Sequence, residues 1–486
     1  MKIGQTSIIV FVSKVVGSAI GFFATVYFAR ELGAEVLGIY ALVLTIVSWM
    51  ILLSELGIGK AVTKRISEGK EQGAYLAASL VWIIALIVLF AGCIIVLRPV
   101  FERYIDGFSQ YISLSVVWVI IGLLAVNIFF KITYRILKGQ RLVHIVGILN
   151  TVQVGGQSLI QLALVIGGAG LGGLFMGWTI GGLIVALIGL YWVRVRPRVP
   201  SKQHFRSLYD YAKYSWLGSL KSRTFNDVDI LLLGVFVQSS LVGVYSVAWS
   251  IAKFLELFGG AISQTMFPEI SYMATQKKDQ AVSGLINDSL AYTGLIAIPG
   301  LVGGGILAER LLRIYGPEFR QGASVLILLV LATLLYSYLE QLLNALNGIN
   351  RPDLSFRINV VFISLNAGLN VLLIPEYGID GAAVASVVSV GFSLVLAYRS
   401  LARLVTFKTP IGEITYQILA ALMMGILIVV GLGIVSATSL GQHNFALVIL
   451  LVISGAGIYL LTLLGLSKRF RQTILRNLPN ISRSSA

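Results

Sequence analysis

The sequence predicts an all-α membrane protein with about fourteen transmembrane helices, because nearly its whole length is apolar enough to lie in lipid. Of the 486 residues, 57% are hydrophobic and only 12% are charged, and the mean hydropathy is +0.89. A soluble protein of this length has about 25% charged residues. Apolar stretches recur along the chain near the length of roughly 20 residues that a helix needs to cross the bilayer core. Lipid is therefore the main solvent of this chain.

Each predicted span is an apolar stretch that ends at polar or basic residues. The loops between spans are at most roughly twenty residues long, which leaves no room for a separate soluble domain. The two longest loops are expected at Arg194–Tyr211 and Phe267–Leu285. In order, the spans are 6–29, 36–58, 74–97, 110–133, 142–167, 171–193, 212–236, 240–266, 286–308, 322–347, 355–375, 379–402, 414–437 and 443–466.

Basic residues indicate the orientation of the spans, since cytoplasmic loops carry an excess of Lys and Arg. With these spans, 26 of the 37 Lys and Arg residues lie on the side that holds both termini, and 6 lie on the opposite side. We therefore expect a multi-pass protein of the inner or plasma membrane with both termini in the cytoplasm. The formal net charge of +16 is then an orientation signal and a contact with membrane lipids, and it does not indicate nucleic acid as a partner.

Two segment pairs indicate an internal repeat. The segment Gly33–Tyr40 matches Gln238–Tyr245 at an offset of 205 residues. The amide stripe of the fifth span (Asn150, Gln157 and Gln161) returns in the eleventh span at a constant offset of 209, as Asn359, Asn366 and Asn370. Because each half holds six spans, an even number, we expect parallel repeats related by a pseudo-two-fold axis along the membrane normal.

The repeat also predicts the domain organisation. Each six-span half should form one lobe, and the last two spans should lie outside the repeat. The expected parts are an N-lobe at 1–194, a cytoplasmic linker at 195–211, a C-lobe at 212–408, two further helices at 409–466 and a basic cytoplasmic tail at 467–486.

Six short motifs carry a resemblance to a known family. They are Tyr211–Ser215, Asp229–Gly234, Gly243–Tyr245, Tyr315–Phe319, Asn344–Gly348 and Tyr377–Ala385. In their order and spacing they resemble the polysaccharide-transporter branch of the multidrug/oligosaccharidyl-lipid/polysaccharide (MOP) exporter superfamily. This resemblance covers spans one to twelve. It implies a V-shaped fold of two lobes and a flippase that moves prenyl-diphosphate-linked oligosaccharide from the cytoplasmic to the outer leaflet by alternating access.

Two other branches of the superfamily stay open as alternatives. Lipid II flippases, which move a peptidoglycan precursor, also use a cationic cavity. Ion-coupled multidrug exporters tend to build their sites from acidic and aromatic residues with little positive charge, so they match less well. The short loops leave no room for the exposed catalytic loop of a glycan polymerase or a membrane glycosyltransferase, and we expect a transporter instead of an enzyme.

Four cations inside predicted spans are the first candidates for a substrate-binding site, because an intramembrane charge usually faces a cavity or a partner. At ~1.5 Å per residue, Lys14 lies ~12 Å from the cytoplasmic end of its span. Lys221 and Arg223 lie ~14–17 Å deep, and Lys253 lies ~20 Å deep. These side chains are expected to form one layer in the inner half of the membrane, where they can replace the hydration of a diphosphate.

Structural roles are the alternative for the same charges. Arg223 and Asp227 are four residues apart and can pair on one helix face, as can Lys253 and Glu256 at a spacing of three. Lys14 has no acidic residue three or four positions away. Local pairing therefore cannot explain Lys14, and it ranks first among the candidates.

Lys131 and Glu55 are intramembrane charges of a different kind. Both lie near predicted cytoplasmic helix ends, where a long side chain can reach the headgroups. We interpret them as snorkelling side chains.

The amide stripes are candidates for binding sugar hydroxyls, through Asn150, Gln157 and Gln161 in one half and Asn366 and Asn370 in the other. Hydrogen bonds between helices are an equally good explanation. Chemistry alone does not choose between these two roles.

Cofactors are not expected. The single cysteine lies in an apolar run and the three histidines show no ligand spacing, so no metal site is predicted. Because the glycine-rich turn after the fifth span lacks a preceding strand and a Lys-Ser/Thr pair, no nucleotide site is predicted either. Transport should then run on an ion gradient, with Asp229 or Glu340 as the coupling carboxylate, or on substrate supply. Expected partners are the lipid-linked oligosaccharide, membrane lipids and the enzymes of glycan biosynthesis.

Overall fold

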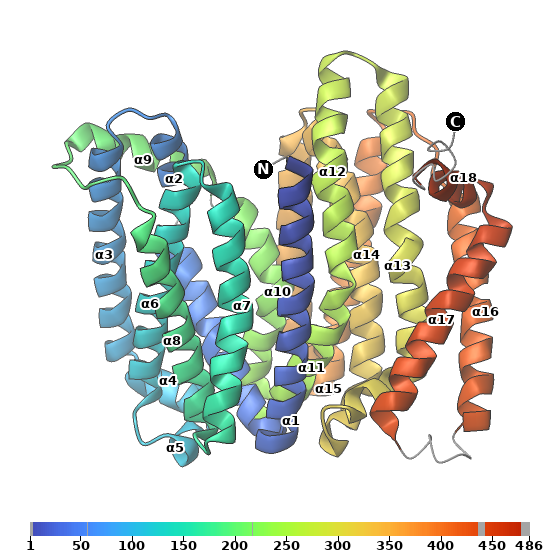
Figure 1. Cartoon of the computed structure of the whole chain (residues 1–486), viewed down its shortest axis with the longest axis horizontal. Coiled ribbons are helices and arrows are strands. Elements are labelled where there is room, and N and C mark those ends of the chain that lie inside the picture. The colour runs from blue at the N-terminus through green and yellow to red at the C-terminus, as the bar shows by residue number, and fades with distance from the viewer. Residues whose placement is uncertain (1–2, 56, 216, 436–442, 478–486) are drawn as a thin grey trace, which may run out of the picture. The chain divides into compact units, whose positions relative to one another are not determined.

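The computed structural model describes residues 3–55, 57–215, 217–435 and 443–477, and every extended regular element in these ranges is a helix (Figure 1). For helix residues 3–16, 18, 213–215, 217–219, 221, 222 and 474–477, it describes the backbone alone. The chain divides into two compact units, Met1–Ser246 and Val247–Ala486. The all-helical class expected from the sequence is confirmed.

Unit 1 contains ten helices and the start of an eleventh, which continues into unit 2. They are α1 (Ile3–Glu55), α2 (Ile58–Ser67), α3 (Gln72–Val96), α4 (Arg98–Tyr104), α5 (Phe108–Tyr111), α6 (Val116–Gly139), α7 (Val143–Ile166), α8 (Gly170–Tyr191), α9 (Lys202–Ser215), α10 (Leu217–Phe236) and α11 (Ser239–Phe254). Unit 2 continues with α12 (Glu256–Thr275), α13 (Asp279–Arg313), the 3₁₀ helix η1 (Pro317–Gly322), α14 (Ala323–Gly348), α15 (Pro352–Ala402), α16 (Ile411–Val435), α17 (Asn444–Leu466) and α18 (Lys468–Asn477).

Ten helices in the described residues are long and apolar enough to cross a membrane, or eleven if α11 and α12 are counted as one bent span. Two of the long helices are each broken at a single glycine. Gly33 has φ 81° inside α1, and Gly378 has φ 55° inside α15. Glycine populates positive φ without steric cost, so the chain can change direction there within one residue. These breaks lie between the first two predicted spans and between the eleventh and twelfth.

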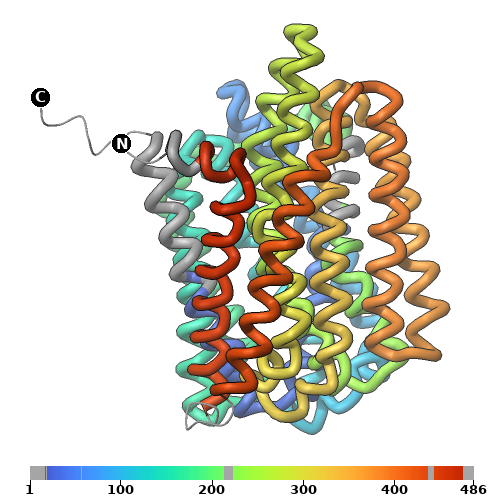
Figure 2. The backbone as a smooth tube through the Cα atoms, turned by 90° about the vertical axis from the view of Figure 1, so that its right-hand side faces the viewer, coloured from blue at the N-terminus to red at the C-terminus, as the bar shows by residue number. Residues whose placement is uncertain are grey.

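A loop expected at Phe267–Leu285 is mostly helical instead. α12 continues to Thr275, and α13 begins at Asp279. Figure 2 shows this yellow-green hairpin extending past the other helices of unit 2. The prediction was wrong because hydropathy indicates where lipid contact ends, whereas a helix can continue into water.

Amphipathic helices also lie outside the predicted spans. α9 begins inside the expected linker, α2 follows the second predicted span, and α18 lies in the expected basic tail. In α9 the buried residues His204, Leu208 and Ala212 form one stripe at a spacing of four. A helix that lies along a membrane surface needs such a stripe and no long apolar run, so a search for spans misses it. α2 and α9 lie at one end of the unit 1 bundle, and α4 and α5 lie at the other (Figure 1).

A close backbone contact in unit 1 joins the two segments that match at an offset of 205. A Cβ added to Gly38 would lie 1.7 Å from the Ser239 carbonyl oxygen, and a Cβ added to Gly243 would lie 1.9 Å from that of Ala34. Only glycine fits at either position, because the clashing atoms belong to the backbone. The contact is reciprocal, since Ala34 matches Ser239 and Gly38 matches Gly243.

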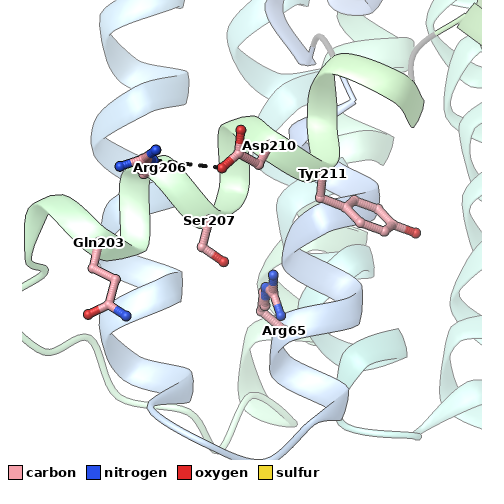
Figure 3. A pocket seen from close by; sticks show the side chains of 6 residues that line it. All are labelled: Arg65, Gln203, Arg206, Ser207, Asp210 and Tyr211. Atoms are coloured by element: carbon pink, nitrogen blue, oxygen red, sulfur yellow. Dashed lines mark ion pairs between the residues drawn. The ribbon is translucent and has the colours of Figure 1, made fainter.

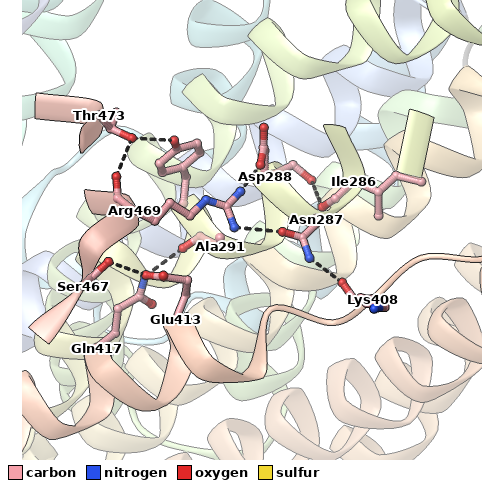
Figure 4. A network of polar contacts seen from close by, with 12 residues as sticks. Ile286, Asn287, Asp288, Ala291, Lys408, Glu413, Gln417, Ser467, Arg469 and Thr473 are labelled. Carbon is pink, nitrogen blue, oxygen red and sulfur yellow. Dashed lines mark hydrogen bonds and ion pairs between the residues drawn. The ribbon is translucent and has the colours of Figure 1, made fainter. Parts of the chain in front are cut away.

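A polar network in unit 2 holds the C-terminal helices to α13 (Figure 4). The Arg469 guanidinium of α18 donates to Asn287 at 2.8 Å, pairs with Asp288, and lies over the Tyr292 ring. From α16, Gln417 donates to the Ala291 carbonyl at 2.8 Å. α16 and α17 also share an apolar core with α13 and α14. These helices are therefore an integral part of unit 2.

Candidate functional site

A carboxylate at the end of α1 lies against two cations of α6. Lys131 and Arg135 are four residues apart, which places them on one face of that helix. The Glu55 carboxylate is 3.3 Å from the Arg135 guanidinium and 3.9 Å from the Lys131 amine. Partial burial and the nearby Arg135 guanidinium lower the pKa of Lys60 in α2. Positive charge is thus concentrated around a single carboxylate at this end of unit 1.

A second ion pair extends this group along α1. Arg223 of α10 pairs with Asp227 at 2.7 Å and also donates to the Ser48 hydroxyl. Ser48 and Glu55 are seven residues apart, or about two turns, on the same face of α1. Arg223 interacts electrostatically with Lys131. We call these six residues the α1–α6–α10 cluster: Ser48, Glu55, Lys131, Arg135, Arg223 and Asp227.

The cluster has more cations than carboxylates. Its three basic side chains are 27–33% exposed, whereas both carboxylates are 15% exposed. The acids are thus covered, and parts of the ammonium and guanidinium groups stay accessible. Lys131 lies ~12 Å from the C-terminal end of α6, and Arg223 lies ~9 Å from the start of α10. Such an arrangement can hold an anionic group, because Arg and Lys donate short charge-assisted hydrogen bonds to phosphate oxygens.

The structure describes the side chains of two of the four candidate cations, Arg223 and Lys253. Arg223 forms the ion pair with Asp227 that its spacing predicts. Lys253 is exposed and belongs to unit 2. The side chains of Lys14 and Lys221 lie outside the described residues. A common layer of the four cations therefore stays a prediction.

Sequence reasoning missed the acidic centre of the cluster. Snorkelling is not a sufficient explanation of Lys131 and Glu55, because the two side chains pair with each other. Arg135 was treated as a loop residue, although it lies within α6. Its spacing of four from Lys131 was the available signal, since two like charges on one helix face repel each other and a nearby acid relieves that repulsion.

The amide stripe of α7 makes hydrogen bonds between helices. Gln157 donates to the Trp178 carbonyl at 3.1 Å. Gln161 donates to the Leu174 carbonyl and to the Tyr40 hydroxyl, both at 2.8 Å. Both glutamines are buried, so their contacts support the interhelical role.

Small residues of α8 make these bonds geometrically feasible. A Cβ added to Gly177 would lie 2.5 Å from the Gln161 side chain, and one added to Gly181 would lie 2.5 Å from that of Gln157. Each glutamine therefore packs against a glycine that has no side chain to displace it. This is the close packing through small residues that stabilises helix pairs in lipid.

Of the matching amides of α15, Asn366 bonds across the helix break, whereas Asn370 bonds within its own helical segment. Asn366 is buried and donates to the hydroxyls of Ser386 and Ser389 at 3.3 Å, across the break at Gly378. Asn370 is also buried and donates to the Asn366 carbonyl at 2.9 Å. Asn150 is only partly buried. A sugar-binding role for the five amides stays a prediction. Asn150 is the best candidate among them, because its side chain is partly exposed.

The two candidate ion-coupling acids have different surroundings. Asp229 is buried and accepts a hydrogen bond from the Tyr245 hydroxyl at 2.5 Å. Glu340 is partly exposed and, together with Glu256, acts electrostatically on Tyr336. Ion coupling through Asp229 or Glu340 stays a prediction.

Several known protein sequences are similar to this chain. The model of the polysaccharide biosynthesis protein family matches residues 3–274. A probable flippase of Haloferax volcanii, AglR, is 32% identical over 97% of this chain and 98% of its own length. The chain belongs to the polysaccharide biosynthesis protein family. A second relative from the same organism, Agl15, described as a probable low-salt glycan biosynthesis flippase, is 30% identical over 87% of this chain and 89% of its own length.

Solved structures show the fold of this family member. The lipid II flippase MurJ in an inward closed conformation matches 96% of this chain and 100% of its own with a TM-score of 0.77 at 16% identity. An inward-facing multidrug resistance MATE transporter of the MOP superfamily matches 79% of this chain and 94% of its own with a TM-score of 0.63 at 14% identity. The family match confirms the resemblance to polysaccharide biosynthesis proteins, and the fold is similar to that of a transporter of the MOP superfamily.

Proposed function

We propose that this protein is a flippase that translocates prenyl-diphosphate-linked oligosaccharide from the cytoplasmic to the outer leaflet by alternating access. The charge excess of the α1–α6–α10 cluster carries the proposal, since three cations face two carboxylates among membrane-crossing helices. Such a cluster suits an anionic carrier better than a cationic drug. Similarity over nearly the whole chain to flippases, one of them of glycan biosynthesis, supports the same class of substrate.

In this proposal the diphosphate binds the accessible cations of the cluster together with Lys14 and Lys221. Lys131 and Arg223 provide charge-assisted hydrogen bonds from α6 and α10, and Lys253 is the remaining cation of the expected layer. Glu55 holds Lys131 and Arg135 in place and Asp227 holds Arg223, so the two carboxylates offset part of the positive charge of the site. The diphosphate then replaces water around groups that are already oriented, which lowers the cost of leaving the headgroup region.

The proposed membrane arrangement has fourteen crossings. The structure supplies eleven candidate spans when α11 and α12 count as one. The breaks at Gly33 and Gly378 divide α1 and α15 into two crossings each, which adds two. α10 is 20 residues long and contains Lys221, Arg223, Asp227 and Asp229, and it adds the fourteenth. Both termini are then cytoplasmic.

Deletion of the gene tests the function class. The expected result is loss of surface glycan together with lipid-linked oligosaccharide that accumulates on the cytoplasmic leaflet. Leaflet location is measured by the access of an impermeant glycosidase in inverted and right-side-out vesicles. Sensitivity to cationic drugs with unchanged glycan would support the multidrug exporter instead, and loss of a peptidoglycan precursor would support the lipid II alternative.

Substitutions test the site itself. The double variant Lys14→Ala/Lys221→Ala and the single variants Lys131→Gln and Arg223→Gln should reduce glycan export, because each removes a charge-assisted contact worth about 1.5–3 kcal/mol. Lys14→Arg should keep more activity than Lys14→Gln, since charge matters more than shape. Arg103→Gln is the matched control, because Arg103 is exposed in α4. Normal export by the well-expressed double variant would contradict the roles of Lys14 and Lys221.

A further inference from the structure

A hollow between α2 and α9 in unit 1 gathers polar side chains that the proposed transport does not use. It has a volume of about 410 Å³ and is lined by Arg65, Gln203, Arg206, Ser207, Asp210 and Tyr211. The other five lining residues belong to α9. In Figure 3, Arg65 of α2 points toward Ser207 of α9, and Arg206 and Asp210 lie on the opposite edge of the α9 ribbon from Ser207. The hollow therefore combines two guanidinium groups with amide, hydroxyl and carboxylate groups.

The position of α9 is fixed by its buried side. His204 is hydrogen-bonded to Ser201 at 2.7 Å and to Glu71 at 3.2 Å, and its ring packs edge-on against Tyr75. Leu208 is fully buried one turn later. With these contacts made, the lining residues lie on the other side of α9, where Arg206 is 86% exposed, and together with Arg65 of α2 they line the hollow.

One lining side chain has an unused donor. The Arg65 guanidinium donates through Nη1 to Glu68 at 2.9 Å and lies over the Tyr75 ring. Its Nε is buried and has no hydrogen-bond partner among the residues that the structure describes. An unsatisfied buried N–H on a charged group is costly unless a ligand or water completes it. Because that atom is covered, an acceptor in the hollow can reach only the part of the Arg65 side chain that stays exposed, which is 26%.

The other charged side chains at the hollow indicate which kind of molecule would carry the acceptor. Arg206 is 86% exposed and its contact with Asp210 is 3.9 Å long, so its guanidinium is available to an anion. Lys64 lies 4.8 Å from the centre of the Tyr211 ring and adds positive charge beside the hollow. Asp210 accepts hydrogen bonds and repels a bare anion. The basic, amide, hydroxyl and carboxylate side chains of the hollow together fit a molecule that has both a phosphate and hydroxyl groups.

We infer that the α2–α9 hollow binds a polyol phosphate, with Arg65 and Arg206 on the phosphate and Asp210, Gln203 and Ser207 on the hydroxyls. A phospholipid headgroup such as phosphatidylinositol has this chemistry, and so does the sugar phosphate of a lipid-linked glycan. α2 and α9 are amphipathic and lie at the end of the unit 1 bundle, where a headgroup would be found. Binding here is separate from the transport step.

The test uses the full-length protein in detergent with inositol 1-phosphate as the probe. Saturable binding, measured by calorimetry, is expected to weaken about tenfold or more in Arg206→Gln, since one charge-assisted contact is lost. Asp210→Asn should weaken inositol 1-phosphate, because an acceptor for its hydroxyls is lost, and should strengthen inorganic phosphate, because a repelling charge is removed. Arg65→Gln should weaken both, and Arg206→Gln serves as the second variant if Arg65→Gln does not fold. Arg103→Gln is the matched control and should bind like the unchanged protein.

Nanodiscs distinguish the two sources of the headgroup. Lipid retained by the protein is measured by native mass spectrometry, with phosphatidylinositol, phosphatidylcholine or lipid-linked sugar phosphate supplied. The inference is supported if the protein retains phosphatidylinositol or the lipid-linked sugar phosphate and Arg206→Gln abolishes this retention. The lipid that is retained identifies the source of the headgroup. The inference is overturned if inositol 1-phosphate does not bind, if it binds no better than inorganic phosphate, or if Arg103→Gln weakens it equally. Because binding is measured without transport, such a failure leaves the flippase proposal unaffected.

Discussion

Gly177 shows how one residue determines the distance between two helices. It lies on α8 where Gln161 of α7 passes, and a Cβ there would meet the Gln161 backbone at 2.7 Å. Gln161 can reach the Leu174 carbonyl because this space is empty. In lipid, where burial of apolar surface gives little drive for helix association, such packing and hydrogen bonds stabilise the pair.

Gly177→Ala should therefore destabilise the protein by about 1–3 kcal/mol through overpacking. Thermal unfolding in detergent, followed by intrinsic fluorescence, measures the effect. Gly172→Ala is the matched control on the same helix, since nothing lies within 4 Å of a Cβ added at Gly172. An alanine there should be neutral or stabilising by up to about 1 kcal/mol. Equal behaviour of the two variants would show that α7 and α8 do not pack as described.

Glu55 is the only carboxylate that pairs with Lys131 and Arg135 among the described residues. Glu55→Gln removes that charge and leaves two cations facing each other, which should cost about 1–3 kcal/mol of stability. Adding Arg135→Gln should recover part of the loss, because it removes one of the repelling charges. A double-mutant cycle on unfolding midpoints measures the recovery.

Glu102→Gln is the control for Glu55→Gln. Glu102 also pairs with an arginine, Arg98, but both side chains are more than 40% exposed. Solvent screens the exposed pair, so Glu102→Gln should leave the unfolding midpoint nearly unchanged. If Glu55→Gln behaved like Glu102→Gln, the cluster would not be an energetically coupled unit.

Helices differ in how completely the sequence predicts them. Apolar runs located the membrane-crossing helices, because a lipid-facing helix must be apolar along its length. α2, α9 and α18 were missed as helices, since their apolar residues form only a stripe. The cluster was missed for another reason. Glu55, Lys131 and Arg223 come from three helices, and only the packing of those helices shows that the residues meet.

The close contact between α1 and the start of α11 predicts that a substitution at Gly243 disrupts folding. Gly243→Ala should prevent the normal approach of the two segments, because its Cβ would lie 1.9 Å from a backbone oxygen. We expect low yield and aggregation, measured by fluorescence-detected size-exclusion chromatography. Gly260→Ala in α12 is the control, as a Cβ there meets nothing within 4 Å. A Gly243→Ala protein with normal yield, midpoint and transport would refute this contact.

The orientation of the entire chain can be tested with one labelling experiment. Cys93, the single cysteine, is first replaced by serine. Gln203→Cys in α9 should then react with an impermeant maleimide only after the cells are opened, and Arg103→Cys in α4 should react in intact cells. Both native side chains are exposed. The opposite pattern would place the termini outside and reverse the direction of transport.

The expected internal repeat predicts how the two halves of the chain superpose. An experimental structure should allow spans one to six to be superposed on spans seven to twelve by rotation about the membrane normal. Asn150 should fall on Asn359, Gln157 on Asn366 and Gln161 on Asn370. The hydrogen bonds of Gln157 and Asn366 to the following helix already run over similar separations, 21 and 20 residues. An inverted relation between the halves would refute the parallel repeat.

The reciprocal contact of Gly38 and Gly243 has a consequence for the history of the chain. When residue i of one copy touches residue j of another and j touches i in return, the arrangement is an isologous interface, the kind found in symmetric dimers. Ala34 and Gly38 meet Ser239 and Gly243 in this reciprocal way. If the two segments descend from one duplicated half, as the expected repeat implies, one mutation in the undivided ancestor would have changed both sides of the contact at once. In the present chain the two glycines can change independently, yet both positions hold glycine, because each backbone occupies the space that the other's side chain would need.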